Sequence, residues 1–182
     1  MLNGPNILLR GLELTDVTEL MKHWNSVEVK RFLFISVPHS VQEEEEWVKY
    51  TWKQRKEGKS FVFAIVYKEK DLYIGNIEIR IINQASRRGD IGIAIFNQSY
   101  WSRGFGTESI QILLKYAFET LNLNSVEIEV FANNPRALRC YEKSGFKEMG
   151  VRREAVFVEG QFIDSILLDI TVDEWKNLQV QN

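Results

Sequence analysis

The chain has 182 residues, of which 45% are hydrophobic and 12% aromatic, so it can bury the core of one ordinary domain. Its 23 lysines and arginines nearly balance its 25 aspartates and glutamates, which excludes the charge excess that binds nucleic acid or anionic lipid. No apolar run is long enough to span a membrane, and residues 4–6 interrupt any apolar leader. The sequence therefore predicts a single domain over residues 1–182 in the cytoplasm, with neither nucleic acid nor membrane as partner.

Metal-binding side chains of the soft type are scarce. One cysteine, Cys140, and two histidines, His23 and His39, are available to build a site. A structural zinc site takes four such ligands, so we expect no metal and no internal disulfide.

The N-terminal part is expected to hold a short strand and two helices. The strand covers Ile7–Leu9, and Thr15–Asp16 begins a first helix with apolar residues at helical spacing. Ser40 with Glu43 forms a capping box that begins a second helix, and Gly58 ends it.

The middle of the chain alternates β-branched and aromatic residues, which indicates three consecutive strands with antiparallel pairing. These strands are Phe61–Tyr67, Leu72–Ile82 and Asp90–Phe96.

After these strands the hydrophobic period changes from two to 3.6 residues, which predicts a helix from near Thr107. The remaining elements are a strand at Ser125–Phe131, a helix from Asn134 to near Gly145, a hairpin of Phe146–Val158 with Phe162–Ile170, and a last helix from Thr171.

The segment from Trp101 to Glu108 is a glycine-containing loop between a strand and an amphipathic helix. Gly104 and Gly106 allow a ligand to approach the main chain, and the helix start offers unpaired N–H groups and a partial positive charge. Together they favour a phosphate or pyrophosphate site. The alternative is a tight strand-to-helix turn without a ligand.

The strand before this loop has one face of unusually small residues. Gly92 and Ala94 share that face, so a slender ligand can lie along the strand. The alternative is that these small residues make room for a packed helix.

Two later segments carry further candidates. Glu127 and Glu129 share one face of their strand and point away from the core. Tyr141 follows on the next helix, within the segment from Asn134 to Phe146.

The loop and this helix together resemble the GNAT superfamily of acyl-CoA-dependent N-acyltransferases. The loop is similar to the family motif Arg/Gln-x-x-Gly-x-Gly/Ala, with Trp101 in place of the Arg or Gln. The helix is similar to the family motif Asn-x-x-Ala-x-x-x-Tyr-x-Lys-x-Gly-Phe, matched by Asn134, Ala137, Tyr141, Lys143, Gly145 and Phe146.

The resemblance implies an α/β (α+β) GNAT fold, with a mixed, mostly antiparallel twisted sheet of about seven strands flanked by helices on both faces. It also implies acetyl-CoA as cosubstrate. Residues 9–12 and 100–101 resemble the subgroup that acetylates ribosomal-protein N-termini, and residues 160–162 are similar to spermidine N-acetyltransferases.

The resemblance also implies which residues bind the cosubstrate. They are Ile93, Ala94, Ile95, Trp101, Ser102, Arg103, Gly104, Phe105, Gly106, Thr107, Asn134 and Tyr141.

Acetyl transfer to an amine needs a base, an oxyanion donor and an acid. Glu129 is at a position that resembles the family's general base, with Glu78 as the rival, and Tyr141 is the candidate acid for the departing thiolate. A backbone N–H of the strand at residues 92–96 is the candidate oxyanion donor. The alternatives are a half-buried helix tyrosine and a solvated strand carboxylate.

The expected acceptor is a primary amine, with a protein or peptide N-terminus as the first choice and a polyamine or other small amine as the second. The acidic run Glu43–Glu46 is expected to be a solvated helix start, or else to attract a cationic acceptor. A non-catalytic acyl-CoA-binding module is the alternative of another class. Exposed Phe157 and Phe162 on the hairpin would support a homodimer.

Overall fold

The computed structural model describes residues 2–33 and 37–180. The α-helices are α1 (Asp16–Met21), α2 (Val27–Lys30), α3 (Val41–Lys56), α4 (Phe105–Lys115), α5 (Pro135–Lys143) and α6 (Val172–Val180). The strands are β1 (Leu2–Asn3), β2 (Ile7–Gly11), β3 (Ser60–Tyr67), β4 (Leu72–Asn83), β5 (Arg88–Ile95), β6 (Ser125–Phe131), β7 (Lys147–Val158) and β8 (Gln161–Thr171).

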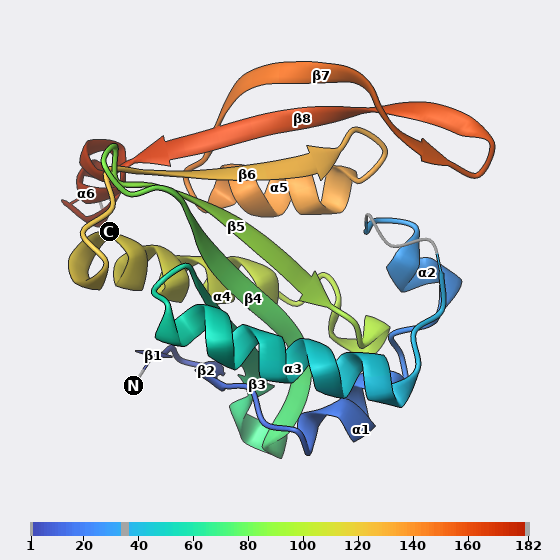
Figure 1. The fold of residues 1–182 in the computed structure, drawn as a ribbon. Coiled ribbons are helices and arrows are strands. Elements are labelled where there is room, and N and C mark those ends of the chain that lie inside the picture. Colours follow the sequence, from blue (N-terminus) through green and yellow to red (C-terminus); the bar gives the residue numbers. More distant parts are fainter. Residues whose placement is uncertain (1, 34–36, 181–182) are drawn as a thin grey trace.

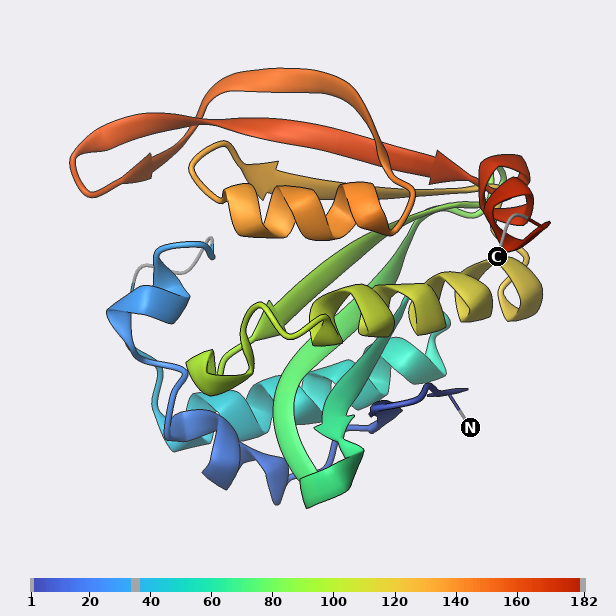
Figure 2. The same ribbon diagram turned by 180° about the vertical axis from the view of Figure 1, so that it is seen from behind.

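The strands form one sheet in the order β1-β2-β3-β4-β5-β6-β8-β7. Neighbours pair antiparallel except β5 and β6, which pair parallel. Helices α1 and α3 lie on one face of the sheet, and α4 and α5 lie on the other (Figures 1 and 2). The predicted α/β fold, a mostly antiparallel sheet with helices on both faces, is confirmed.

Each face of the sheet has its own apolar core. Leu20 of α1 and Val48 of α3 pack against Val62 and Val66 of β3 on the first face. On the second face the core contains apolar residues of α4, among them Ile110, together with Ile7 and Leu9 of β2 and alternate residues of β6. The alternation along each strand sends successive side chains to opposite faces, which is why β3 contributes to both cores.

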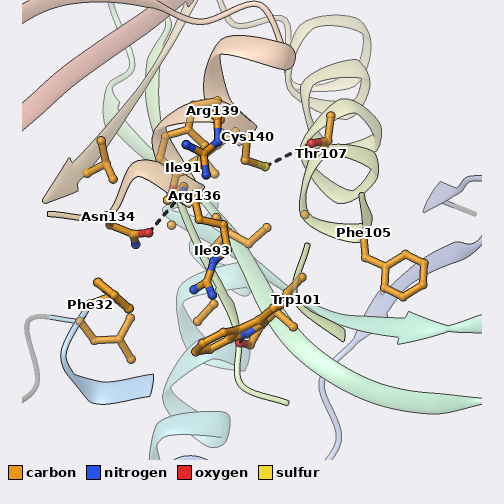
Figure 3. A pocket seen from close by; sticks show the side chains of 18 of the residues that line it. Phe32, Ile91, Ile93, Trp101, Phe105, Thr107, Asn134, Arg136, Arg139 and Cys140 are labelled. Atoms are coloured by element: carbon orange, nitrogen blue, oxygen red, sulfur yellow. Dashed lines mark hydrogen bonds between the residues drawn. The ribbon is translucent and has the colours of Figure 1, made fainter. Parts of the chain in front are cut away.

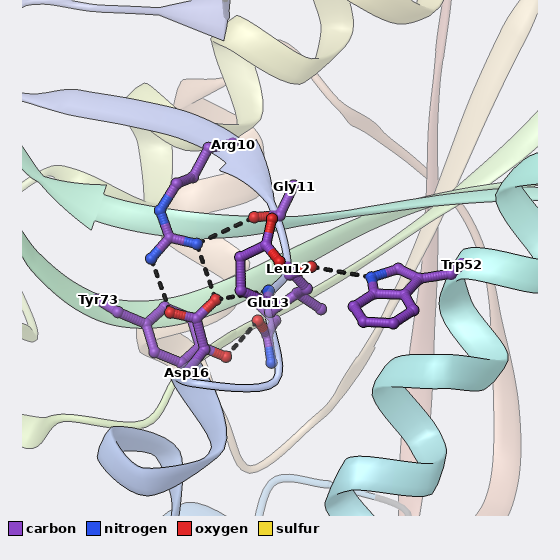
Figure 4. Close-up of polar contacts among 8 residues, drawn as sticks. Arg10, Gly11, Leu12, Glu13, Asp16, Trp52 and Tyr73 are labelled. Carbon is purple, nitrogen blue, oxygen red and sulfur yellow. Dashed lines mark hydrogen bonds and ion pairs between the residues drawn. The ribbon is translucent and has the colours of Figure 1, made fainter.

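A polar cluster ties the first face together where β2 ends. The Arg10 guanidinium makes two 2.7 Å hydrogen bonds to the Asp16 carboxylate, and Arg10 also donates to the carbonyl of Gly11 (Figure 4). The indole of Trp52 donates to the carbonyl of Leu12 at 2.9 Å. These contacts fix α1 and α3 relative to the sheet.

Three local features differ from the sequence prediction. Strand β1 and helix α2 were not predicted, because two to four residues are too few to show a hydrophobic period. Helix α4 begins at Phe105 rather than near Thr107, because Gly104 takes the left-handed conformation, with φ +82°, and caps it. The capping box of Ser40 with Glu43 is present as predicted.

The pairing of β5 with β6 is short. It joins only Arg88–Asp90 to Ser125–Glu127, after which the two strands diverge (Figure 1). Beyond that point β5 continues to Ile95 and β6 to Phe131, and neither strand has a neighbour on the facing edge. The sheet is therefore split into two arms that open toward α2 and the start of α4. Within the described residues, no helix has the length and hydropathy needed to cross a membrane.

Candidate functional site

The two arms of the sheet enclose a cavity of about 630 Å³, a volume in the range of small-molecule sites. Its walls come from β4 and β5, from β6, from the loop before α4, from α5, and from α2 with the residues that follow it. Figure 3 shows this cavity, with side chains of α5 above and Trp101 below. Segments that are far apart in the sequence thus meet at one place.

The glycine-containing loop forms one end of the cavity. Ser102 and Gly104 both have positive φ, 59° and 82°, so the chain turns sharply into α4. Trp101, Ser102 and the first turn of α4 line the cavity, whereas Arg103 does not and instead lies over the ring of Tyr100. A Cβ on Gly104 would meet nothing within 4 Å. The open space and the amides of the helix start fit an anionic ligand such as a diphosphate.

Strand β5 forms the long wall of the cavity. Ile93, Ala94 and Ile95 line it, as does Gly92, whose added Cβ would meet no atom within 4 Å. The facing edge of β5 has no strand neighbour beyond Asp90, so its backbone groups can pair with an extended ligand. The space therefore fits the slender arm of acetyl-CoA as well as its phosphates.

Three carboxylates line the cavity, and they differ in their partners. Both oxygens of Glu129 accept from Nη1 of Arg152 at 2.9 Å, and Asp90 forms an ion pair with Arg80. Glu78 makes no ion pair within the described residues.

Glu78 has a neutral partner instead of a cation. Its Oε1 accepts a 2.5 Å hydrogen bond from the hydroxyl of Ser60, which is buried. Its Oε2 has no partner among the described residues, which leaves this oxygen available to a ligand. Gly92 is paired directly opposite Glu78 in the sheet, so the space above Gly92 adjoins this carboxylate.

Tyr141 and Asn134 come from α5. Asn134 begins the helix, and its Oδ1 accepts from the backbone N–H of Ala137. Tyr141 lines the cavity, is only 6% exposed, and has a hydroxyl with no hydrogen-bond partner among the described residues. Burial raises the pKa of its phenol, so Tyr141 holds its proton throughout the physiological range.

Most of the predicted site residues thus meet at this cavity, including all three candidates for proton transfer. Sequence reasoning missed Ser60, Phe32 and Arg136. Arg136 is two residues after the motif residue Asn134, but the sequence does not show that its side chain points into the cavity, because this depends on the tertiary structure. Phe32 carries no sequence signal that links it to a site.

Comparison with known proteins places this architecture among acetyltransferases. The family model described as "Acetyltransferase (GNAT) domain" matches residues 6–147. An uncharacterised N-acetyltransferase, p20 of Bacillus licheniformis, is 28% identical over 169 residues, which cover 93% of this chain and 94% of the relative.

Solved structures agree on the fold. The spermidine N-acetyltransferase of Vibrio cholerae, in complex with CoA and spermine, superposes with a TM-score of 0.85 at 26% identity, covering 96% of this chain and 100% of that one. The ribosomal-protein-S5-alanine acetyltransferase of Vibrio fischeri superposes with a TM-score of 0.84 at 16% identity, covering 95% of this chain and 97% of that one. At that identity the second likeness shows the fold alone.

Proposed function

The chain belongs to the GNAT acetyltransferase family and is an acetyl-CoA-dependent N-acetyltransferase, and we propose that its acceptor is the amino group of a peptide or protein N-terminus. The observation that carries this proposal is the charge of the cavity. Of the three carboxylates that line it, Glu129 and Asp90 form ion pairs with arginines, so Glu78 is the one whose negative charge is in no ion pair among the described residues. One such charge matches one ammonium group.

The rest of the cavity suits the remainder of a peptide. Val29, Phe32 and Leu33 add apolar side chains to the wall that comes from α2 and the residues after it. A peptide N-terminus carries its ammonium beside an apolar or polar side chain, whereas a polyamine carries several ammonium groups and would need several free carboxylates. The match with one free carboxylate supports the peptide.

The cosubstrate is held by this chain's own backbone. The amides of residues 102–107 and the start of α4 bind the diphosphate, and the free edge of β5 binds the extended arm. When bound, acetyl-CoA supplies an activated acetyl thioester.

Glu78 takes the proton of the acceptor ammonium on Oε2, the oxygen that does not accept from Ser60. A positioned base contributes about 10²–10⁴-fold to the rate. An α-amine with a pKa near 8 is about one-tenth neutral at pH 7. The rate therefore depends less on the base for an N-terminus than for an amine with a pKa near 10.4, of which a far smaller fraction is neutral. Glu129 is the alternative base, but both of its oxygens are held by Arg152.

The remaining steps use the strand and the tyrosine. A backbone N–H of residues 92–96 donates to the developing oxyanion, an interaction typically worth about 3 kcal/mol. Tyr141 donates its phenol proton to the departing thiolate. Two features suit it to this role: it is protonated in the physiological pH range, and it lines the cavity.

A polyamine is the second candidate, and the named relative favours it, because the similar Vibrio cholerae structure is a spermidine N-acetyltransferase. The acidic start of α3 gives only limited support to a polyamine acceptor. Glu44 is buried, at 3% exposure, and pairs with His39 at 2.6 Å, so the prediction of a solvated run is wrong at that residue. Glu43 is occupied as part of the helix cap.

One assay decides between the two acceptors. Thiol release from acetyl-CoA is measured with free-N-terminus peptides, with the same peptides blocked at the N-terminus, and with spermidine and spermine. We expect release with the free peptides and none with the blocked ones. Release with polyamines alone would overturn the peptide proposal and support the second candidate.

A further inference from the structure

Arg136 has an unusual position in the cavity. It is the second residue of α5, and its side chain extends across the cavity toward Trp101 of the opposite loop (Figure 3). Its guanidinium carbon lies 3.6 Å from the centre of the Trp101 ring and 5.7 Å from that of Phe32. The Trp101 ring is itself fixed, because its Nε1 donates to the carbonyl of Ile95 at 2.6 Å. The guanidinium is thus held by aromatic faces.

This guanidinium has no anionic partner among the described residues. Within residues 2–33 and 37–180, the guanidinium makes no hydrogen bond or ion pair to a carboxylate, and its contacts are with the aromatic faces of Trp101 and Phe32. Burial lowers the pKa of Arg136, because the charged guanidinium is partly removed from water. A cation in the first turn of a helix also opposes the helix dipole. A bound anion offsets both the desolvation of the guanidinium and its repulsion by the helix dipole.

The loop has an aromatic residue at the polar first position of the family motif. Trp101 stands where that motif has Arg or Gln, and Arg103 faces Tyr100 outside the cavity wall. Arg136 lies directly over the Trp101 ring, so a cation from the opposite helix is next to the residue that replaces the Arg or Gln of the motif.

We propose that Arg136 binds a phosphate group of acetyl-CoA, and that Trp101 positions the Arg136 side chain for this contact. The planar guanidinium suits two parallel hydrogen bonds to phosphate oxygens, while its face remains on the indole. Arg139 and Lys143 line the same cavity from later turns of α5 but are exposed, which leaves Arg136 as the pre-positioned cation. This proposal concerns the cosubstrate and is independent of the acceptor.

The test measures CoA binding directly, by isothermal titration calorimetry without any acceptor. Arg136→Gln is expected to weaken CoA binding about tenfold, the usual effect of losing a charge-assisted hydrogen bond. Arg136→Lys keeps the charge but not the planar face, and we expect it to lose less CoA affinity than Arg136→Gln. The matched control is Arg153→Gln, which removes the same charge from an exposed position on β7 outside the cavity and should bind CoA as the wild type does.

A second ligand identifies which phosphate is contacted. Dephospho-CoA lacks the ribose 3′-phosphate. If Arg136→Gln loses affinity for CoA but not for dephospho-CoA, Arg136 contacts the 3′-phosphate. If it loses affinity equally for both ligands, Arg136 contacts the diphosphate. CoA affinity in Arg136→Gln within about twofold of the wild type, with an unchanged melting temperature, would overturn the proposal.

The positioning role of Trp101 has its own test. Trp101→Leu is expected to weaken CoA binding, and the double variant with Arg136→Gln should bind no more weakly than Arg136→Gln alone, because both changes remove the same contact. Additive losses would show that Trp101 does not act through Arg136, which overturns this part of the proposal.

Discussion

Gly92→Val should abolish most of the activity without damaging the fold. Gly92 is paired opposite Glu78, and an added Cβ meets nothing within 4 Å, so the valine side chain occupies the open space beside the Glu78 carboxylate. Displacing the reacting groups by about 1 Å costs roughly 10²-fold in rate, and that is the expected loss in kcat/KM. The assay is thiol release from acetyl-CoA with the best acceptor.

The same substitution should stabilise the protein. Glycine within a strand is less favourable by roughly 0.5–1 kcal/mol, and valine favours strands, so the melting temperature should rise by about 1–4 °C.

The matched control is Gly75→Ala on the neighbouring strand β4. Its Cβ would lie 2.4 Å from the carbonyl oxygen of Ala94 and 2.9 Å from the Cα of Ile95, both backbone atoms that cannot turn aside. We expect a loss of roughly 1–3 kcal/mol in stability, seen as a lower melting temperature.

Wild-type kcat/KM in Gly92→Val would refute the reasoning, because the reaction could not then take place in the space beside Glu78.

Three other variants test the roles of single side chains. Glu78→Gln should lower kcat by about 10²–10⁴-fold and Glu129→Gln by about tenfold or less, whereas the reverse order would make Glu129 the base. Tyr141→Phe should lower turnover about 10²-fold while calorimetry shows unchanged CoA binding; full turnover would remove Tyr141 from the mechanism. Hydrogen bonds from Lys147 and Thr171 lower the pKa of Glu174 to about 2, so its ionised form stabilises the fold above pH 4.5. The stability lost in Glu174→Gln, followed by denaturant titration, should therefore shrink as the pH falls from about 4.5 to 2, and a constant difference would contradict this linkage.

The sequence was informative where local chemistry decides the structure. The capping boxes at Ser40 and Thr171, and the left-handed Gly160 in the closing hairpin, depend on residues close together in the chain. The glycine-containing loop belongs to the same class, and its residues line the cavity apart from Arg103 and Glu108. Local hydrogen bonds and permitted φ values can be read from neighbouring residues, so these features were predictable.

Contacts between distant segments were not predictable in the same way. Ser60 reaches Glu78 because β3 and β4 pair in the register that places Ser60 opposite Arg80. A shift of one residue would turn the serine to the other face of the sheet. The pairing of Glu129 with Arg152 likewise depends on the β7–β8 hairpin lying next to β6. The ranking of the two candidate bases therefore required the structure.

The divergence of β5 from β6 determines why this fold presents a ligand site at all. Backbone N–H and C=O groups on a buried edge need partners, and strand pairing ends at Asp90 although β5 continues to Ile95. Trp101 satisfies the carbonyl of Ile95 with its indole, which closes the far end of this edge. The groups between those two points face the cavity. An extended ligand with amide groups can pair with them as an added strand would, so the binding of the acetyl-CoA arm follows from the unpaired edge rather than from any one side chain.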